Sequence, residues 1–426
     1  ERDLQEARNR QLQADVLIHE TYTSPNSTGA SFQGDPNSSS MSMGSGHAYV
    51  PTVREIEHYT RMLNNPGAAM PHGVFVLADE ANGLAITGLS QNCAQFFGKE
   101  VPELMGKSLL EYIDNPSAIE AALMMKDLTL ANPVSVGIVG EDGTMRLLAN
   151  LILHRLPNGL AIDIEELDPY ENAFSFHARV RQAIDRLHTC ETSEAMCQRV
   201  SEEFFQLSGY DRVMMYKFHE DHHGEVVTEF CTENIKDDSF LGLHYPATDI
   251  PQRSRDQFKA VSVRIIVDAR APDSPILLNE GDATEMLPLT MSSLRPAHAC
   301  HKEYLVNMGV RASVAVAIVV KDQLWGLMIA HHMEPKFVSF QMRMAVEFLT
   351  QAFSMALTNL TDTAAHSRHE RSLNLHSKLC DKMYQQGSNP GLRVRGLIQS
   401  EPSISDLIPG VTGAVVYYRG TISSIG

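Results

Sequence analysis

The sequence predicts an α+β protein of more than one domain, in which helices flank antiparallel sheets. The chain has 426 residues, which is more than one hydrophobic core usually organises. Hydrophobic residues make up 43% of the chain and charged residues 20%, so it has enough apolar surface to fold. Strand-like runs come in pairs and meanders with helical stretches between the groups, and this order favours antiparallel pairing.

The first 50 residues are expected to precede the first domain. Leu4, Ala7, Leu12 and Val16 are spaced as on one face of an amphipathic helix that needs a partner. From Thr23 to about His47, Ser, Gly, Asn and Pro dominate, which is typical of a flexible linker.

Residues 51–169 are predicted to form the first domain. The strand-like runs GVFVLADE and LAITGL flank a turn at Asn82 and Gly83. A helical stretch follows, and three further strand-like runs complete the meander: PVSVGIV, MRLLANLILHRL and LAIDIEEL.

Residues 170–338 are predicted to form a second domain of the same class. It begins with helical periods over 173–187 and 193–208. Four strand-like runs, DRVMMYKF, GEVVTEFC, ASVAVAIVV and LWGLMIAHH, surround a loop-rich middle.

A long helix is predicted over 339–386, where apolar residues trace a continuous stripe, and such a helix either connects domains or forms a dimer face. Residues 387–426 are expected to be the first strands and helix of a third domain that stops before it could close a core.

Composition excludes several functional classes. A formal charge of −17 argues against nucleic-acid binding. Lys321, Asp322 and Gln323 interrupt the most apolar stretch, so no membrane span is expected, and the charged residues 1–6 do not open a signal peptide. The six cysteines contain no CxxC pair, which favours a reducing compartment, the cytoplasm, over a disulfide framework or a zinc site.

The residues best suited to chemistry lie in the loop-rich middle of the second domain. Cys300 stands between His298 and His301, and an adjacent imidazole can assist thiolate formation, although an isolated cysteine is more often structural. Asp249 lies in YPATDIP, where two prolines stiffen the loop, but a turn-capping role would be ordinary.

Two arginines and two histidine pairs need separate interpretations. Arg264 and Arg295 could hold carboxylates through bidentate hydrogen bonds, or could be solvated surface residues. Neighbouring residues on a strand point to opposite faces, so His222–His223 and His331–His332 are not expected to bind a metal.

The order of these segments resembles the phytochrome family: MPHG, DRVMMYKF, GEVVTE, LHYPATDIPQ, an arginine-led loop ending in CH, then NMG and LWGLMIAHH. Within the family, these motifs are most similar to those of the plant, algal and cyanobacterial members. The resemblance implies a PAS domain (51–169), a chromophore-binding GAF domain (170–338), a connecting helix (339–386) and the start of a PHY domain (387–426). It also implies that the PHY hairpin that seals the pigment site of relatives lies beyond Gly426, so a poorly stabilised light-activated state is expected.

The resemblance further implies a photoreceptor that carries a linear tetrapyrrole, phycocyanobilin or phytochromobilin, on the thiol of Cys300. Light would switch the pigment by Z/E isomerisation between rings C and D. The implied contacts are Asp249 and His301 at the pyrrole nitrogens, Arg264, Arg295 and Ser313 at the propionates, Tyr216, Tyr245 and Tyr304 around ring D, and His331 at the ring D carbonyl.

The family also suggests a homodimer, a histidine-kinase-like output carried elsewhere and entry into the nucleus after light activation. No kinase motif occurs in this chain, so it is not expected to be an enzyme itself.

The loop departs from the family pattern, since RPAHACH stands where plant-type members usually have RAPHGCH, and this puts the absorption colours in question. Cys231 matches no usual position; it is either an ordinary strand-end thiol or a second thiol that adds to the pigment. Two other classes stay open: a pigment-free sensor, for example of a cyclic nucleotide, and a cysteine hydrolase built on Cys300.

Overall fold

The computed structural model describes residues 64–168, 173–250, 252–279, 287–385, 387, 389–398, 401–408 and 410–425. The chain divides into two compact units, Glu1–Cys190 with Glu194–Ser354, and Glu191–Ser193 with Met355–Gly426. The helix and the linker expected in the first 50 residues lie outside the described part.

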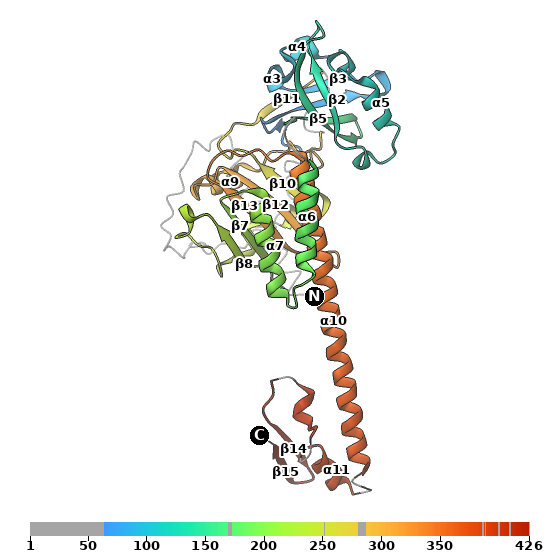
Figure 1. The fold of residues 1–426 in the computed structure, drawn as a ribbon, viewed down its shortest axis with the longest axis vertical. Coiled ribbons are helices and arrows are strands. Elements are labelled where there is room, and N and C mark those ends of the chain that lie inside the picture. Colours follow the sequence, from blue (N-terminus) through green and yellow to red (C-terminus); the bar gives the residue numbers. More distant parts are fainter. Residues whose placement is uncertain are drawn as a thin grey trace, which may run out of the picture. The chain divides into compact units, whose positions relative to one another are not determined.

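The first domain is built on a seven-stranded antiparallel sheet of order β1-β11-β3-β2-β6-β5-β4 (Figure 1). Its strands are β1 (Ala68–Ala69), β2 (Gly73–Asp79), β3 (Ala85–Ser90), β4 (Val134–Val139), β5 (Met145–Leu156), β6 (Gly159–Glu166) and β11 (Ser274–Leu278). Short helices α3 (Ala94–Phe97), α4 (Val101–Leu104) and α5 (Pro116–Leu123) lie between β3 and β4.

Both faces of the central strand β2 are buried, which explains why its sequence is apolar at nearly every position. Val74 and Val76 belong to the core that includes the residues of α3 to α5. Phe75 and Leu77 belong to a second core on the other face.

One strand of this sheet comes from far along the chain. β11 pairs with β1 through Ala69↔Ser274 and with β3 through Ile276↔Ser90. The neighbouring residues Leu287, Leu289 and Leu294 complete the second core. The loop-rich middle of the second domain therefore contains a strand of the first domain's sheet, which the sequence pattern did not indicate.

The second domain has a six-stranded antiparallel sheet of order β10-β12-β13-β7-β8-β9. Its strands are β7 (Arg212–Phe218), β8 (Gly224–Cys231), β9 (His244–Tyr245), β10 (Val263–Ile266), β12 (Ala312–Val320) and β13 (Gln323–His332). The helices are α6 (Ala173–Leu187), α7 (Ser193–Ser208), α8 (Gln252–Ala260) and α9 (Ala299–Asn307).

Helices cover the two faces of this sheet differently. On one face, Ser201 of α7 lies 2.6 Å from Thr228 of β8, and Trp325 of β13 makes an edge contact with Phe353 of α10 (Phe340–Gln385). On the opposite face, Phe258 of α8 packs against the cluster around Tyr216.

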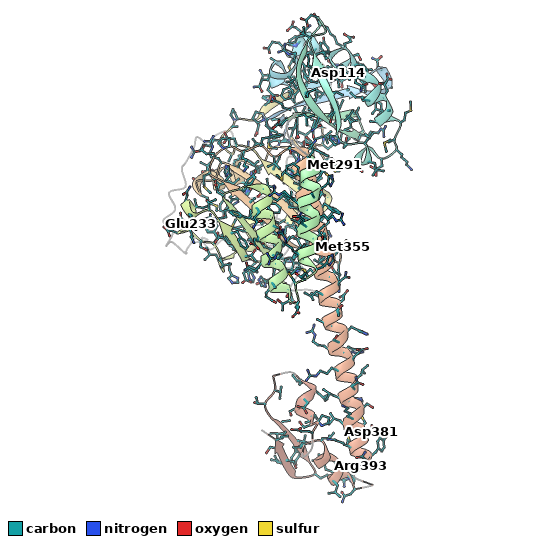
Figure 2. All side chains as sticks on the ribbon, in the orientation of Figure 1. Asp114, Glu233, Met291, Met355, Asp381 and Arg393 are labelled. Atoms are coloured by element: carbon teal, nitrogen blue, oxygen red, sulfur yellow. The ribbon has the colours of Figure 1, made fainter. Side chains whose placement is uncertain are left out.

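Helix α10 is 46 residues long, close to the length the apolar stripe predicted. Near its start, Arg343 forms a buried ion pair with Glu165 of β6 at 2.6 Å. Residues 361–374 are all exposed, and Figure 2 shows their side chains along this helix between the labelled Met355 and Asp381.

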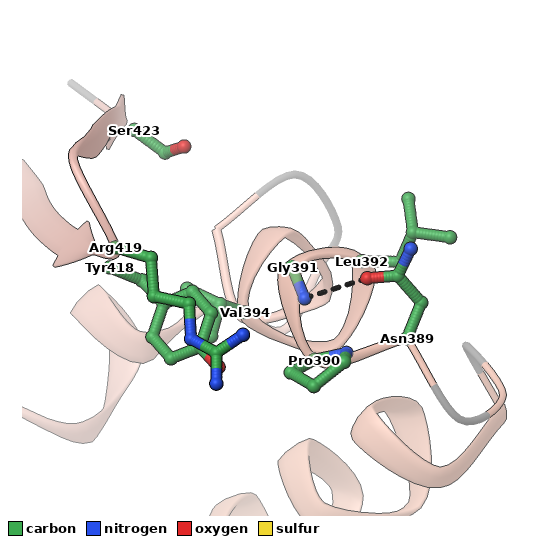
Figure 3. Close-up of a pocket in the computed structure, with 8 residues that line it drawn as sticks. All are labelled: Asn389, Pro390, Gly391, Leu392, Val394, Tyr418, Arg419 and Ser423. Atoms are coloured by element: carbon green, nitrogen blue, oxygen red, sulfur yellow. Dashed lines mark hydrogen bonds between the residues drawn. The ribbon is translucent and has the colours of Figure 1, made fainter.

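The C-terminal unit contains α11 (Pro390–Gly396) and the hairpin of β14 (Ala414–Tyr418) and β15 (Thr421–Ile425). A cavity of about 410 Å³ lies between the start of α11 and this hairpin, where Asn389 accepts a hydrogen bond from the Gly391 amide (Figure 3). It contains none of the predicted site residues. Among the described residues, no helix combines the length and apolar composition needed to cross a lipid bilayer.

Candidate functional site

One face of the six-stranded sheet carries four of the predicted site residues. Ser313 of β12 pairs directly with His331 of β13. Tyr216 of β7 pairs with Leu327, and Arg264 of β10 pairs with Ala315. Directly paired residues share a face, and so do residues two apart on a strand, so these rows place all four side chains on the same face.

Tyr216 lies at the centre of an aromatic group on this face. Its ring lies 6.0 Å from that of Tyr245 on β9 and 5.3 Å from that of Phe218. A Cβ at Gly224 would lie 1.8 Å from the Tyr216 ring, so only glycine allows this packing. The Tyr216 hydroxyl is buried and has no hydrogen-bond partner in the part of the chain that the structure describes.

Asp249 lies at the end of the short helix η6 (Ala247–Asp249), in the loop that follows β9. Its side chain contacts solvent, yet the surrounding protein desolvates it enough to raise the pKa of the carboxyl. Its charge in turn contributes to raising the pKa values of Tyr216, Tyr245 and Tyr304, although desolvation is the larger cause. The carboxylate and the three tyrosines therefore lie in one neighbourhood.

Arg255 of α8 holds this loop in place. Its Nε donates to the Ile250 carbonyl at 2.7 Å and its Nη2 to the Ala247 carbonyl at 2.9 Å. Its guanidinium also lies 4.4 Å from the centre of the Phe218 ring. The sequence analysis did not single out Arg255, although it lies only three residues beyond the motif LHYPATDIPQ.

Helix α9 positions three predicted residues. Cys300 lies in its first turn, where the His298 ring accepts a hydrogen bond from the Cys300 amide at 3.3 Å. The partial positive charge at a helix N-terminus stabilises a negative charge beside it, and the thiolate is the reactive form of a cysteine. The ring of Tyr304 lies one turn further along, 6.3 Å from that of His301.

Both predicted histidines are held in the neutral form at neutral pH. Burial lowers the pKa of His331 to about 3, with smaller contributions from the charges of Arg212 and His301. Desolvation also lowers the pKa of His301, although its side chain contacts solvent. Nδ1 of His331 is buried, and no described residue hydrogen-bonds it.

The two predicted arginines are also close to each other. Burial, followed by the charge of Arg295, lowers the pKa of Arg264 to about 9. Burial lowers that of Arg295 to about 10. Arg264 donates to the Ser292 carbonyl at 3.2 Å and to that of Thr290, while its buried Nε has no hydrogen-bond partner within the described ranges. Two cations this close and this desolvated favour an anion beside them.

Two charged residues that the sequence analysis missed support the site. Arg212 is buried against Glu229 at 3.0 Å and lies on the His331 side of the sheet, because the two residues pair directly. Asp163 of β6 accepts hydrogen bonds from the Ser292 hydroxyl and the Ser293 amide, both at 2.7 Å, which holds the segment that Arg264 contacts. Only their burial distinguishes them from surface charges, and sequence spacing does not reveal it.

Cys231 pairs with Arg212 at the far end of β8 from Tyr216. Burial, and then the charge of Glu229, raises the pKa of this thiol, so the thiolate is disfavoured. The six cysteines, all in the described part of the chain, form no disulfide.

Comparison with known families agrees with this architecture. The PAS fold family matches residues 58–167, and the GAF domain family matches residues 192–358. Among solved structures, the chromophore-binding domain of Stigmatella aurantiaca phytochrome P1 is 32% identical, with a TM-score of 0.64, and the match covers 68% of this chain and 96% of that one. The chain belongs to the phytochrome family.

Other phytochromes extend the match. The photosensory core module of Stigmatella aurantiaca phytochrome has a TM-score of 0.74 and 29% identity over 85% of this chain and 71% of that one. Phytochrome E of Arabidopsis thaliana is 34% identical over 87% of this chain, and phytochrome B of the same plant is 32% identical over 98%. The chain spans 35% and 37% of the lengths of these two plant phytochromes. The expected family and the α+β class with PAS and GAF domains are thus confirmed.

Proposed function

We propose that this chain is the light-sensing part of a phytochrome and carries a bilin on Cys300. The observation that carries the proposal is a set of buried polar atoms on one face of the GAF sheet that have no hydrogen-bond partner among the described residues: the Tyr216 hydroxyl, Nδ1 of His331 and Nε of Arg264. Leaving such atoms unpaired costs about 1–3 kcal/mol each, so their convergence is best explained by a polar ligand.

The residues on this face, together with those of the adjoining loops and helix α9, fit a bilin of the phycocyanobilin or phytochromobilin type. Arg264 and Arg295, with Ser313, would neutralise the two propionates. Asp249, through its backbone carbonyl, and His301 would bind the pyrrole nitrogens. His331 would hydrogen-bond the carbonyl of ring D, and Tyr216, Tyr245 and Tyr304 would surround that ring.

When bound, the bilin supplies light absorption and Z/E isomerisation between rings C and D. The chain's own residues would determine which hydrogen bonds form around the pigment in each of its two isomers. His331 is neutral at pH 7, so its ring can donate or accept without a buried charge. Arg255 fixes the backbone on both sides of Asp249, so a change in the hydrogen bonds of this loop would be transmitted to α8.

The wider organisation is part of the same proposal. Residues 51–169 would form the PAS domain, 170–338 the GAF domain, 339–386 the connecting helix and 387–426 the start of a PHY domain. The histidine-kinase-like output would be carried by another part of the protein. This chain would have no catalytic activity of its own. We place the protein in the cytoplasm, with nuclear entry after light activation, and as a homodimer.

Co-expression with bilin-synthesis enzymes tests the proposal. The wild-type chain should absorb visible light, change its spectrum reversibly on irradiation, and retain a zinc-fluorescent pigment after denaturation. Mass spectrometry should show the pigment mass on the peptide that contains Cys300.

Two variants give this test its controls. Cys300→Ala should lose the covalent pigment, whereas Cys231→Ala should keep it. A colourless wild-type protein that still folds would reject the proposal and favour a pigment-free sensor. Pigment retained covalently in Cys300→Ala would show that the attachment site is wrong.

A further inference from the structure

Three histidines at one edge of the GAF sheet lie within reach of a single ion. His219, His223 and His244 each offer one ring nitrogen, and these atoms all lie within 4.8 Å of one another. The rings of His219 and His223 stack with their centres 4.3 Å apart and their planes 5° from parallel, so one ring must turn for both to direct a nitrogen at the same ion. Nε2 of His223 lies 3.0 Å from Nδ1 of His244.

The hairpin between β7 and β8 creates this arrangement. The amide of His219 donates to the His223 carbonyl at 2.9 Å, which closes a three-residue loop, and His222 adopts φ +69° at its end. His219 and His223 thus face each other across the hairpin. Strand β9 brings His244 alongside, since Glu225 pairs with His244 next to the Gly224↔Tyr245 pair.

We propose that His219, His223 and His244 form a binding site for a divalent transition metal ion of the zinc class. Three imidazoles with an open fourth position are a common donor set for Zn²⁺. Two nitrogens that bind one tetrahedral ion at about 2.0–2.1 Å lie roughly 3.3 Å apart. The His223–His244 pair, at 3.0 Å, needs only a small shift, in which the metal replaces the proton that the two nitrogens share.

The carboxylates beside the histidines support a metal role over a surface cluster. Oδ1 of Asp221 lies 2.5 Å from Nδ1 of His223, which turns Nε2 of the same ring toward His244. Oε2 of Glu225 lies 2.9 Å from Nε2 of His219. Carboxylates that hydrogen-bond the second nitrogen of a ligand histidine fix its tautomer and raise its basicity. Both acids also supply negative charge that offsets the charge of the ion.

A metal at this place would stabilise the loops beside the candidate pigment site. His244 directly precedes Tyr245, and the loop with Asp249 follows. The carbonyl of His222, within the hairpin loop, accepts a hydrogen bond from Arg255 at 2.9 Å. The ion would therefore tie the hairpin loop to the start of the segment that Arg255 holds.

The site can be tested by titrating the tag-free, pigment-free chain with ZnCl₂ in a calorimeter and by measuring retained zinc after dialysis. We expect one equivalent to bind. His223→Asn and His244→Asn should each lower the affinity at least tenfold, and Asp221→Asn should lower it about tenfold, as outer-shell substitutions do. His244 is exposed on a two-residue strand, so its substitution should leave the fold intact, which a thermal melt without zinc verifies.

His222→Asn is the matched control. It removes a neighbouring imidazole at a position of positive φ that asparagine tolerates well, so zinc affinity should be unchanged within twofold. The three-histidine site is wrong if the wild-type chain binds no zinc at millimolar concentration. It is equally wrong if either His223→Asn or His244→Asn keeps the wild-type affinity, which would assign the bound zinc to other residues.

Discussion

At the scale of single residues, the burial of His331 makes the stability of the chain depend on pH. Its pKa is about 3 in the folded chain against an ordinary 6.5, so only the unfolded chain takes up this proton between these values. Stability is therefore fully present above about pH 6.5 and is lost as the pH falls toward 3. From pH 7 to pH 5 this one group should cost about 2 kcal/mol.

Urea unfolding of the pigment-free chain at pH 7 and pH 5 measures this loss. His331→Gln keeps a polar side chain but cannot take up a proton, so the difference between the two pH values should shrink by about 2 kcal/mol in the variant. An equal pH dependence in both proteins would show that His331 is not the group responsible.

At the residue scale, sequence reasoning selects candidates most readily where unusual residues are neighbours in a motif. Asp249 with its flanking prolines, and Cys300 beside His301, could be selected because each motif concentrates unusual residues. Sequence reasoning did not find the candidate metal ligands. It compared His223 with its neighbour His222, whereas the histidines that lie near His223 are His219, across a hairpin, and His244, on another strand. Whether a charge is buried, as for Arg212, is likewise fixed only by packing.

At the scale of elements, the ion pair between Arg343 and Glu165 joins α10 to strand β6. Burial raises the pKa of Glu165, but the charges of Arg343 and His72 outweigh it and lower the pKa to about 2. Arg343→Met would leave a buried carboxylate without its cation and should cost about 3–5 kcal/mol of stability at pH 7. Urea denaturation measures the loss.

The double variant Glu165→Gln/Arg343→Met separates charge from packing. Removing both charges should recover most of the stability that Arg343→Met loses, because no uncompensated charge stays buried. If the double variant is as unstable as the single one, the cost comes from lost packing of the arginine side chain.

Helix α10 also presents an apolar stripe that none of the described residues covers. Met344, Phe348 and Met355 are 47%, 55% and 69% exposed and recur at helical spacing on one face. In the proposed homodimer this stripe would pack against a second copy. Phe348→Glu should therefore weaken dimerisation at least tenfold in sedimentation velocity, while Gln323→Glu at the exposed start of β13 should not. A tightly dimeric Phe348→Glu protein would place the interface elsewhere.

Element prediction succeeded where a local pattern was strong. Helices α6 and α7 and strands β5, β8 and β12 have the bounds that their periodicity predicted. It failed for β1, which has two residues, and for β11, whose five residues read as part of a loop. The pairing of β11 with β3 joins residues nearly two hundred positions apart, and no local pattern encodes such a partner.

At the scale of the whole molecule, the first domain should be incomplete without the segment that contains β11. Ile276, Leu287, Leu289 and Leu294 are buried in its second core. At about 1.5–3 kcal/mol for each buried side chain, their absence removes on the order of 6–12 kcal/mol. A fragment of residues 64–190 should thus be largely unfolded, or should expose β3 as a free edge and aggregate.

Adding a peptide of residues 273–295 in trans provides the control. It should restore protection of the β3 amides in hydrogen exchange, whereas the same peptide with Ile276→Lys should not. If the fragment 64–190 is as stable alone as with the peptide, β11 contributes little to the stability of the sheet.

Because β11 comes late in the sequence, it also determines when the first domain can finish folding during synthesis. A ribosome completes β6 about 130 residues before it reaches Leu294, which at roughly 5–20 residues per second is a wait of about 6–26 s. During that interval the first domain emerges with an unfinished edge, and chaperones can bind it. The two domains are therefore expected to mature together, and slow codons or an insertion between β6 and β11 should lower the yield of folded protein without altering any residue of either core.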